Sequence, residues 1–273
     1  MKRLVLVACL AVAAAAGCGG EAGTAHPMQA LAQTAAKLDE IKSGTLHFAL
    51  DVEPHEDGGS FGFELDGPFE LRGPDELPVA EIEYTQTAGG ERESVTLTST
   101  GEEAFITVDG TAYELPPDRI DELRGESGAG GLEELRIDDW LVEPESSDGG
   151  DVGGTDTDKI EAKLDVVAAV NDLAELAQSF GGPALDPIGG QEAEQLQSAV
   201  RDAKIEVWTG DEDRLLRRLR IEADFDPQLP GWLEELARAA GSKVTFELAI
   251  DDANEPVEVE APDNPRPASE LPN

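Results

Sequence analysis

The spacing of apolar residues changes along the chain from a helical to a strand period. Over residues 28–42 apolar side chains recur at helical spacing, which predicts an amphipathic helix. From Thr45 to Leu115 apolar and polar residues alternate, with breaks at Gly-rich and Pro-rich turns, which predicts strands with one apolar face. Asp109-Gly110, between two short alternating runs, is a strong hairpin signal. This part of the chain therefore reads as an antiparallel meander.

The second half mixes helices and strands. Residues 117–136 are polar and predict two short helical pieces, followed by an acidic, Gly-rich loop over residues 145–158. The total is about eleven strands and about four helices, and a sheet of that size must curl, close or split. We expect helices at 166–179, 191–202 and 231–240, strands at 159–165, 203–208 and 215–225, and a closing hairpin that pairs 244–250 with 257–259.

The stretch RLLRRLR, residues 214–220, has two readings. At helical spacing its arginines do not collect on one side, which argues against a basic helix. At a period of two, four apolar residues point one way and four charged residues the other, so the stretch predicts a strand whose outer face pairs arginines with acids. The apolar set is Leu219, Ile221, Ala223 and Phe225, and the charged set is Arg218, Arg220, Glu222 and Asp224.

The N-terminus resembles an export signal. Residues 1–17 combine a short cationic start with an apolar run too short to span a bilayer. Small residues precede Cys18, the pattern at which lipoprotein signals are cleaved, although Ala15 stands where Leu is commonest. We expect lipidation of Cys18, with simple secretion as the alternative. The sequence thus divides into a signal peptide (1–17), a flexible tether (18–27), a single domain (28–262) and a disordered tail (263–273).

Charge and cysteine content narrow the classes of partner. The chain has 59 acidic and 20 basic residues and a net charge of −39, which becomes −41 without Lys2 and Arg3. Such a surface repels phosphate backbones, so nucleic acid is not an expected partner. Of the two cysteines, Cys9 leaves with the signal, and a single remaining cysteine forms no disulfide within the chain and no thiolate metal site.

No known catalytic motif is present, and the chain is expected not to be an enzyme. The three histidines (His26, His47 and His55) have no nucleophile or metal partner at a recognisable spacing. Residues 148–158, DGGDVGGTDTD, offer carboxylates to calcium but lack the order of an EF-hand, and a solvated acidic loop is the simpler interpretation. No cofactor and no metal are expected.

Several stretches resemble one bacterial family. DWLVEP followed by GGTDTDKIEAKLDV and an apolar helix is similar to the mid-section of the LppX/LprA/LprF/LprG envelope lipoproteins. IEVWTGDEDRLLRRLRIEA looks like their penultimate hairpin, and FELAIDDANEPVEVEAPD like their closing one. SGTLHFALDV and TVDGTAYEL fit the opening strands, so the resemblance covers roughly residues 37–262.

The resemblance implies a fold and a function. The fold is an α+β half-barrel, a large curled antiparallel sheet with helices on its concave side, in the wider LolA/LolB-like group of lipid and lipoprotein carriers. The function is binding of acylated lipid or glycolipid in an apolar cavity and its carriage within the cell envelope, by a monomer anchored to the outer face of the cell membrane through Cys18. An envelope transporter is a further expected partner. The alternative is an envelope interaction or sensor lipoprotein on the same fold.

The residues expected to line the cavity follow from the inward face of the strands and from one helix. The apolar face of helix 166–179 either packs as core or lines the cavity, and the sequence leaves both open. A shift of one residue in strand register would turn the opposite face inward. The expected lining residues are Phe48, Leu50, Phe61, Phe63, Leu97, Val170 and Leu173.

Overall fold

Twelve strands form one sheet in the computed structural model, which describes residues 26–55, 59–73, 76–126, 136–179, 187–226 and 241–271. The sheet runs in the order β12-β6-β5-β4-β3-β2-β1-β11-β10-β9-β8-β7. Two meanders, β1–β6 and β7–β11, therefore meet at the antiparallel pair β1·β11. The strands are β1 (Ser43–Pro54), β2 (Phe61–Glu70), β3 (Val79–Ala88), β4 (Glu91–Thr100), β5 (Ala104–Val108), β6 (Thr111–Glu114), β7 (Leu141–Val152), β8 (Thr155–Leu164), β9 (Val200–Gly210), β10 (Leu216–Phe225), β11 (Ser242–Asp251) and β12 (Arg266–Pro267).

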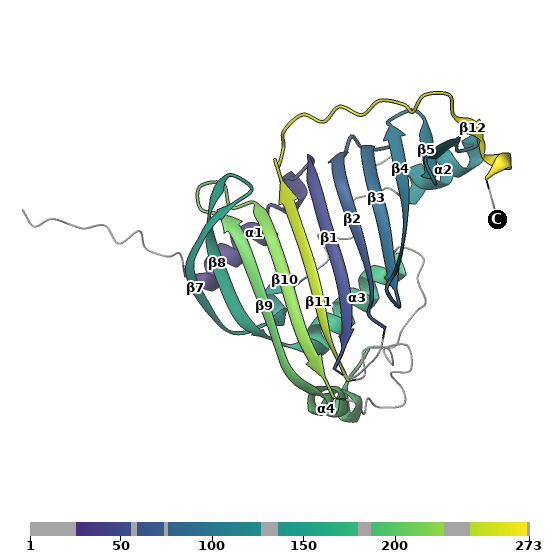
Figure 1. Cartoon of the computed structure of the whole chain (residues 1–273). Coiled ribbons are helices and arrows are strands. Elements are labelled where there is room, and N and C mark those ends of the chain that lie inside the picture. Colours follow the sequence, from purple (N-terminus) through teal and green to yellow (C-terminus); the bar gives the residue numbers. More distant parts are fainter. Residues whose placement is uncertain are drawn as a thin grey trace, which may run out of the picture.

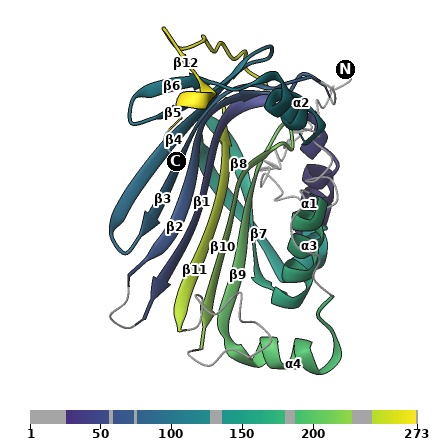
Figure 2. The ribbon, with the colours of Figure 1, turned by 90° about the vertical axis from the view of Figure 1, so that its right-hand side faces the viewer.

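The sheet curls, and the helices lie on its concave side (Figures 1 and 2). This confirms the expected α+β half-barrel. Helix α1 contacts β7 and β9, and α4 contacts β9 and α3. The α-helices in the described residues are α1 (Pro27–Ala35), α2 (Pro117–Glu126), α3 (Val166–Ser179) and α4 (Gly190–Ala199), and the 3-10 helices are η1 (Leu38–Glu40), η3 (Ile137–Trp140) and η5 (Ala268–Glu270).

The main core lies between the β8–β11 half of the sheet and the helices. Leu31 of α1 and Trp140 of η3 are each 1% exposed and belong to the same cluster as the strand residues Ile160, Ile205 and Val207. Burying a side chain of this size stabilises a fold by about 1.5–3 kcal/mol. This half of the concave face is therefore an ordinary packed core.

The prediction of an acidic loop at residues 145–158 is wrong, because this segment belongs to a hairpin. Residues of this segment form most of β7 and the start of β8, which pair as a hairpin with turn glycines Gly153 and Gly154. Polar residues dominate both faces of β7 because it is an edge strand of the sheet, so the alternation that reveals a strand is missing. Gly149 is required here, since a Cβ atom would lie 2.9 Å from Cδ1 of Trp208.

The prediction that residues 244–250 pair with residues 257–259 in a closing hairpin is also wrong. Val257 and Val259 alternate with acids as a strand would, but β11 is already paired with β1 on one side and β10 on the other. The segment after β11 instead crosses the ends of the first meander as an extended strap (Figure 1). Its end differs from the expected disordered tail, because Arg266–Pro267 form β12 in parallel with β6. The helix expected at 231–240 lies outside the described residues.

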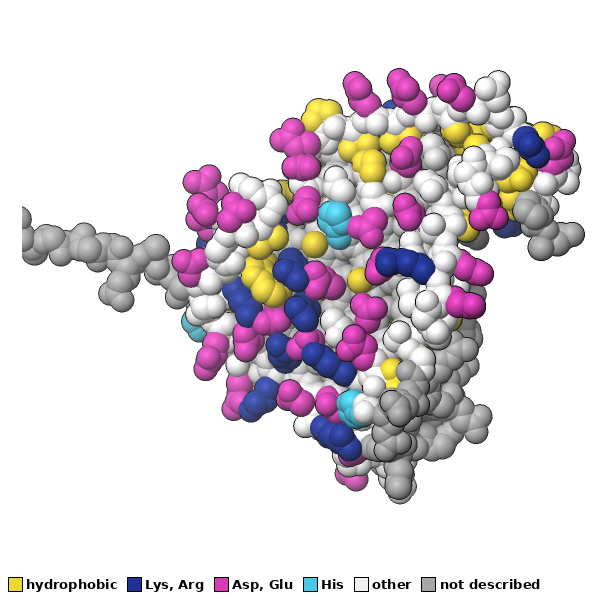
Figure 3. Space-filling view, viewed as in Figure 1, with side chains coloured by type: hydrophobic (Ala, Val, Ile, Leu, Met, Phe, Trp, Pro, Cys, Tyr) yellow, Lys and Arg dark blue, Asp and Glu magenta, His cyan; other side chains and the backbone are white. Residues whose placement is uncertain are grey.

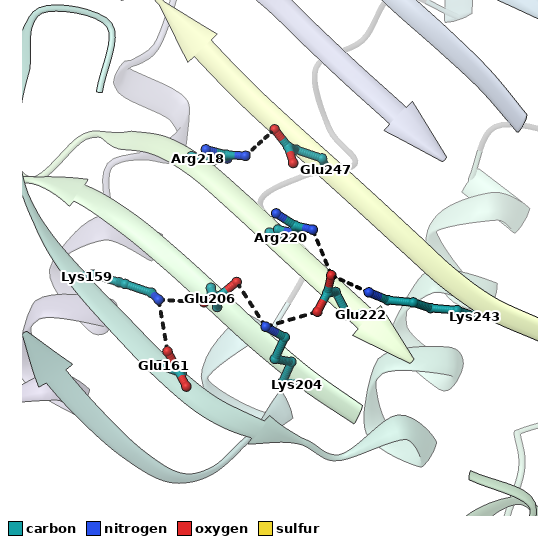
Figure 4. Close-up of polar contacts among 9 residues, drawn as sticks. All are labelled: Lys159, Glu161, Lys204, Glu206, Arg218, Arg220, Glu222, Lys243 and Glu247. Carbon is teal, nitrogen blue, oxygen red and sulfur yellow. Dashed lines mark hydrogen bonds and ion pairs between the residues drawn. The ribbon is translucent and has the colours of Figure 1, made fainter. Parts of the chain in front are cut away.

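The strand reading of RLLRRLR is confirmed. Leu219 is 3% exposed on the concave face, while Arg218 and Arg220 point to the outer face. There Arg218 forms an ion pair with Glu247 at 2.7 Å and Arg220 one with Glu222 at 2.7 Å (Figure 4). The stretch departs from strict alternation at a bulge between Leu216 and Arg218, where Arg217 is buried and paired with Asp213 at 2.5 Å.

Basic side chains gather on the outer face over the β8–β11 half, intermixed with acids (Figure 3). Trp208 lies among them, with the Lys159 ammonium 5.2 Å and the Arg218 guanidinium 5.1 Å from its ring centre. Glu222 accepts hydrogen bonds from Lys243 at 2.8 Å and Arg220 at 2.7 Å, and forms an ion pair with Lys204 at 2.9 Å. The bonds from Lys243 and Lys204 lower the pKa of Glu222 to about 2.

The low pKa of Glu222 predicts a pH-dependent contribution to stability. Its folded pKa lies below that of an unfolded glutamate, near 4.3, so the contribution is present above that pH and is lost as pH falls towards 2. Glu222→Gln should lower the free energy of unfolding by about 2 kcal/mol at pH 7, after allowance for screening of its partly exposed partners. Urea unfolding at pH 7 and pH 3 measures this.

A nearby carboxylate supplies the control for Glu222. Glu161 is bonded to Lys159 at 2.9 Å in the same network, but its side chain is 55% exposed against 13% for Glu222. Glu161→Gln should therefore change stability by less than about 0.5 kcal/mol. Equal effects of the two substitutions, or an effect of Glu222→Gln that does not shrink at pH 3, would contradict this explanation.

Candidate functional site

The concave face is divided into a covered half and a partly exposed half. Under α1 and η3, Ile160 and Ile205 are both 0% exposed. Along β1–β5 most side chains on the same face are also apolar, yet Tyr84 remains 38% and Leu97 39% exposed. We call this surface the open apolar face. It comprises Phe48, Leu50, Phe61, Phe63, Leu65, Ile82, Tyr84, Val95, Leu97, Ile106 and Val108, of which none is fully buried.

Strand register brings these residues onto one face. Phe48 pairs with Leu65, Leu65 with Tyr84, and Tyr84 with Val95, so the four form one row across β1–β4. The next row continues from Ile82 through Leu97. Residues paired across antiparallel strands point to the same side, so the alternation along each strand sums to a continuous apolar surface.

Aromatic rings stiffen the part of this face nearest the sheet centre. The rings of Phe48 and Phe63 stack at 5.4 Å, and Phe246 of β11 meets Phe48 edge-on at 5.1 Å. Tyr84 lies 6.2 Å from Phe63 in a tilted arrangement. Each contact has the spacing of favourable aromatic pairs. The rings hold one another in place, so this part of the face is a rigid apolar surface.

Most residues expected to line a cavity lie on this face. The structure brings together Phe48, Leu50, Phe61, Phe63 and Leu97, all on the helix side of the sheet. Whether they enclose a ligand stays a prediction. The residues missed by sequence reasoning were Leu65, Ile82, Tyr84, Val95, Ile106 and Val108, although the same alternation could have found them.

The other site residues predicted from the sequence are Val170 and Leu173 of helix α3 and the lipidation site Cys18. Val170 packs against a second core cluster with Val166, Leu196 and Phe225, so it is a core residue of the helical cover. Leu173 belongs to α3, but its side chain lies outside the described residues. Cys18 also lies outside them, and its lipidation remains a prediction.

A buried carboxylate joins α3 to η3 over the covered half of the concave face. Asp172 is 5% exposed and accepts hydrogen bonds from Nε1 of Trp140 at 2.9 Å and from the Arg136 guanidinium at 2.6 Å. Burial raises the pKa of Asp172, but the bonds from Trp140 and Arg136 together with the Arg136 charge outweigh burial and hold that pKa below its usual value. The carboxylate of Asp165 caps the helix start by accepting from the backbone of Val167 at 3.0 Å. The start of α3 is thereby fixed over the covered half.

The described residues also bear on three other kinds of feature, namely a metal site, a histidine centre and a membrane-spanning helix. They contain no group of three or more His, Cys, Asp or Glu side chains placed to hold a metal ion. His47 faces outward and meets Asp66 at 2.5 Å through Nδ1 and Asp251 at 3.3 Å through Nε2, two partners on opposite sides of its ring. In the same part of the chain, none of the helices combines the length and apolar composition needed to cross a membrane.

Known proteins resemble this chain in structure. No protein-family model and no curated protein matches it in sequence. Among solved structures it is similar to lipoprotein LppX of Mycobacterium tuberculosis, with 14% identity, a TM-score of 0.44, and coverage of 86% of this chain and 98% of that chain. LprF from Mycobacterium bovis is 14% identical, with a TM-score of 0.44 and coverage of 86% of this chain and 96% of that chain. A DUF1329 family protein from Desulfovibrio piger is 8% identical, with a TM-score of 0.24 and coverage of 84% of this chain and 95% of that chain. Two of these structures thus carry names from the lipoprotein family that the sequence resembles.

Proposed function

We propose that the chain is an extracytoplasmic lipoprotein that binds acylated lipid or glycolipid on the open apolar face and carries it within the cell envelope. Its anchor is Cys18, on the outer face of the cell membrane, and it catalyses no reaction. The observation that carries the proposal is the contrast within one sheet face, where apolar side chains are buried on one half and left partly exposed on the other. Exposed apolar surface of this kind is typical of binding sites.

The energetics of such a surface suit a carrier. Each methylene group withdrawn from water contributes about 0.8 kcal/mol, so ten methylenes contribute about 8 kcal/mol before the costs of association. Affinity then grows with the length of the chain buried and needs few directed contacts. A carrier also has to release its load, and a face without charged anchors in its central rows, those of Tyr84 and Leu97, allows this. The resemblance to envelope lipoproteins and the predicted export signal support the same location.

The test is direct uptake of an apolar probe. The chain from residue 19, purified without its lipid anchor and delipidated, should bind diphenylhexatriene with a rise in fluorescence and a Kd in the micromolar range. Native mass spectrometry of the protein before delipidation should show co-purified lipid. A delipidated, folded protein that takes up neither diphenylhexatriene nor a fatty acid would reject the proposal. An envelope sensor whose open apolar face is covered by a partner would give this negative result.

A further inference from the structure

Tyr84 is the polar exception within the central rows of the open apolar face. It sits in the row between Leu65 and Val95, and its neighbours in the next row are Ile82 and Leu97. The side chain is 38% exposed. Its hydroxyl makes no hydrogen bond to another residue that the structure describes. A phenol group in such a position can donate to a ligand without first giving up a partner within the described part of the protein.

The open apolar face changes from apolar to polar side chains at Tyr84. On one side, towards Ile82 and Leu97, the rows are apolar. On the other side, towards the β3–β4 turn at Gly89 and Gly90, the next row across β3 and β4 pairs Gln86 with the exposed Glu93. Tyr84 therefore stands where an apolar ligand segment would end and a polar one would begin.

We propose that Tyr84 orients the bound lipid by donating a hydrogen bond from its hydroxyl to a carbonyl oxygen of the ligand, such as that of an acyl ester or amide. This inference rests on the proposed function. The acyl chain would then extend from Tyr84 over Leu97, and the polar part of the ligand would lie towards Gln86. The residue selects lipids that carry a carbonyl group over plain hydrocarbons of equal length, because only the former satisfy the donor in apolar surroundings.

Tyr84→Phe isolates the hydroxyl. The phenylalanine ring can keep the contact with Phe63 at 6.2 Å, and only the donor is lost. Bound diphenylhexatriene, which has no carbonyl group, serves as reporter, and methyl palmitate and octadecane serve as competitors. The substitution should weaken methyl palmitate about three- to tenfold, the effect of one neutral hydrogen bond, and leave octadecane and the reporter unchanged.

Tyr113→Phe is the matched control. Tyr113 lies on the same sheet in β6 but is 6% exposed, so removing its hydroxyl should leave the ratio of the two competitors unchanged. The inference is overturned if Tyr84→Phe weakens both competitors equally or neither, or if Tyr113→Phe alters their ratio to the same extent. A wild-type protein that binds neither the reporter nor either competitor rejects the proposed function itself, which is a distinct outcome.

Discussion

Asp172→Ala should lower the free energy of unfolding by about 3 kcal/mol. The substitution removes a buried acceptor and leaves Nε1 of Trp140, a residue 1% exposed, without its partner at 2.9 Å. An unsatisfied buried donor costs about 1–3 kcal/mol, and the charge-assisted bond from Arg136 is lost as well. Urea unfolding monitored by tryptophan fluorescence at pH 7 measures the difference.

The exposed neighbour Asp139 provides the control for Asp172. It lies 3.9 Å from the Arg136 guanidinium with 61% of its side chain exposed, so Asp139→Ala should change stability by less than about 0.5 kcal/mol. Because the pKa of Asp172 is lowered, its contribution is present above the pKa of an unfolded aspartate, near 3.9, and is lost as pH falls below it. Similar losses from both substitutions would show that the buried hydrogen bond from Trp140 to Asp172 is not the cause.

Leu97→Asp should reduce binding of diphenylhexatriene at least tenfold while the protein stays folded. Leu97 is 39% exposed, so a carboxylate at this position keeps contact with water in the unliganded protein. A carboxylate on the open apolar face would have to lose water when a ligand covers it, and that desolvation opposes binding. A fluorescence titration gives the affinity, and circular dichroism with urea unfolding verifies the fold.

The opposite face of the neighbouring strand supplies a control with the same new charge. Thr87 of β3 points outward and pairs with Arg92, so Thr87→Asp adds a carboxylate beside a cation and away from the open apolar face. It should leave the affinity for diphenylhexatriene unchanged. If Thr87→Asp weakens binding as much as Leu97→Asp, overall negative charge rather than the open apolar face controls probe binding.

Local alternation predicted much of this fold. The meander from Thr45 to Leu115 and the orientation of Arg218 and Arg220 follow from a period of two, which depends only on neighbours along the strand. β7 was missed because an edge strand needs no apolar face, and the 257–259 strand was wrong because both sides of β11 were occupied. Pairing between distant strands leaves no mark in the local pattern.

The open apolar face shows the same limit. Phe48 and Ile205 occupy similar alternating runs, yet one is partly exposed and the other 0% exposed. The difference arises because α1 and η3 cover one half of the concave face, and helix placement is a tertiary property. The alternation places Phe48 and Ile205 on the helix side of the sheet, and only the structure distinguishes the two halves of that side.

The pairing of β1 with β11 has a consequence for how the protein is made. Thr45 and Asp251 are partners, so about 200 residues separate the two sides of the join between the meanders. Because synthesis runs from the N-terminus, β1–β6 are made before residues 242–251 of β11. Until then the inner edge of β1 carries unpaired backbone groups next to the aromatic rings of Phe48 and Phe63. Pairing of β11 with β1 therefore closes this edge, and before that pairing the incomplete protein exposes it to other strands.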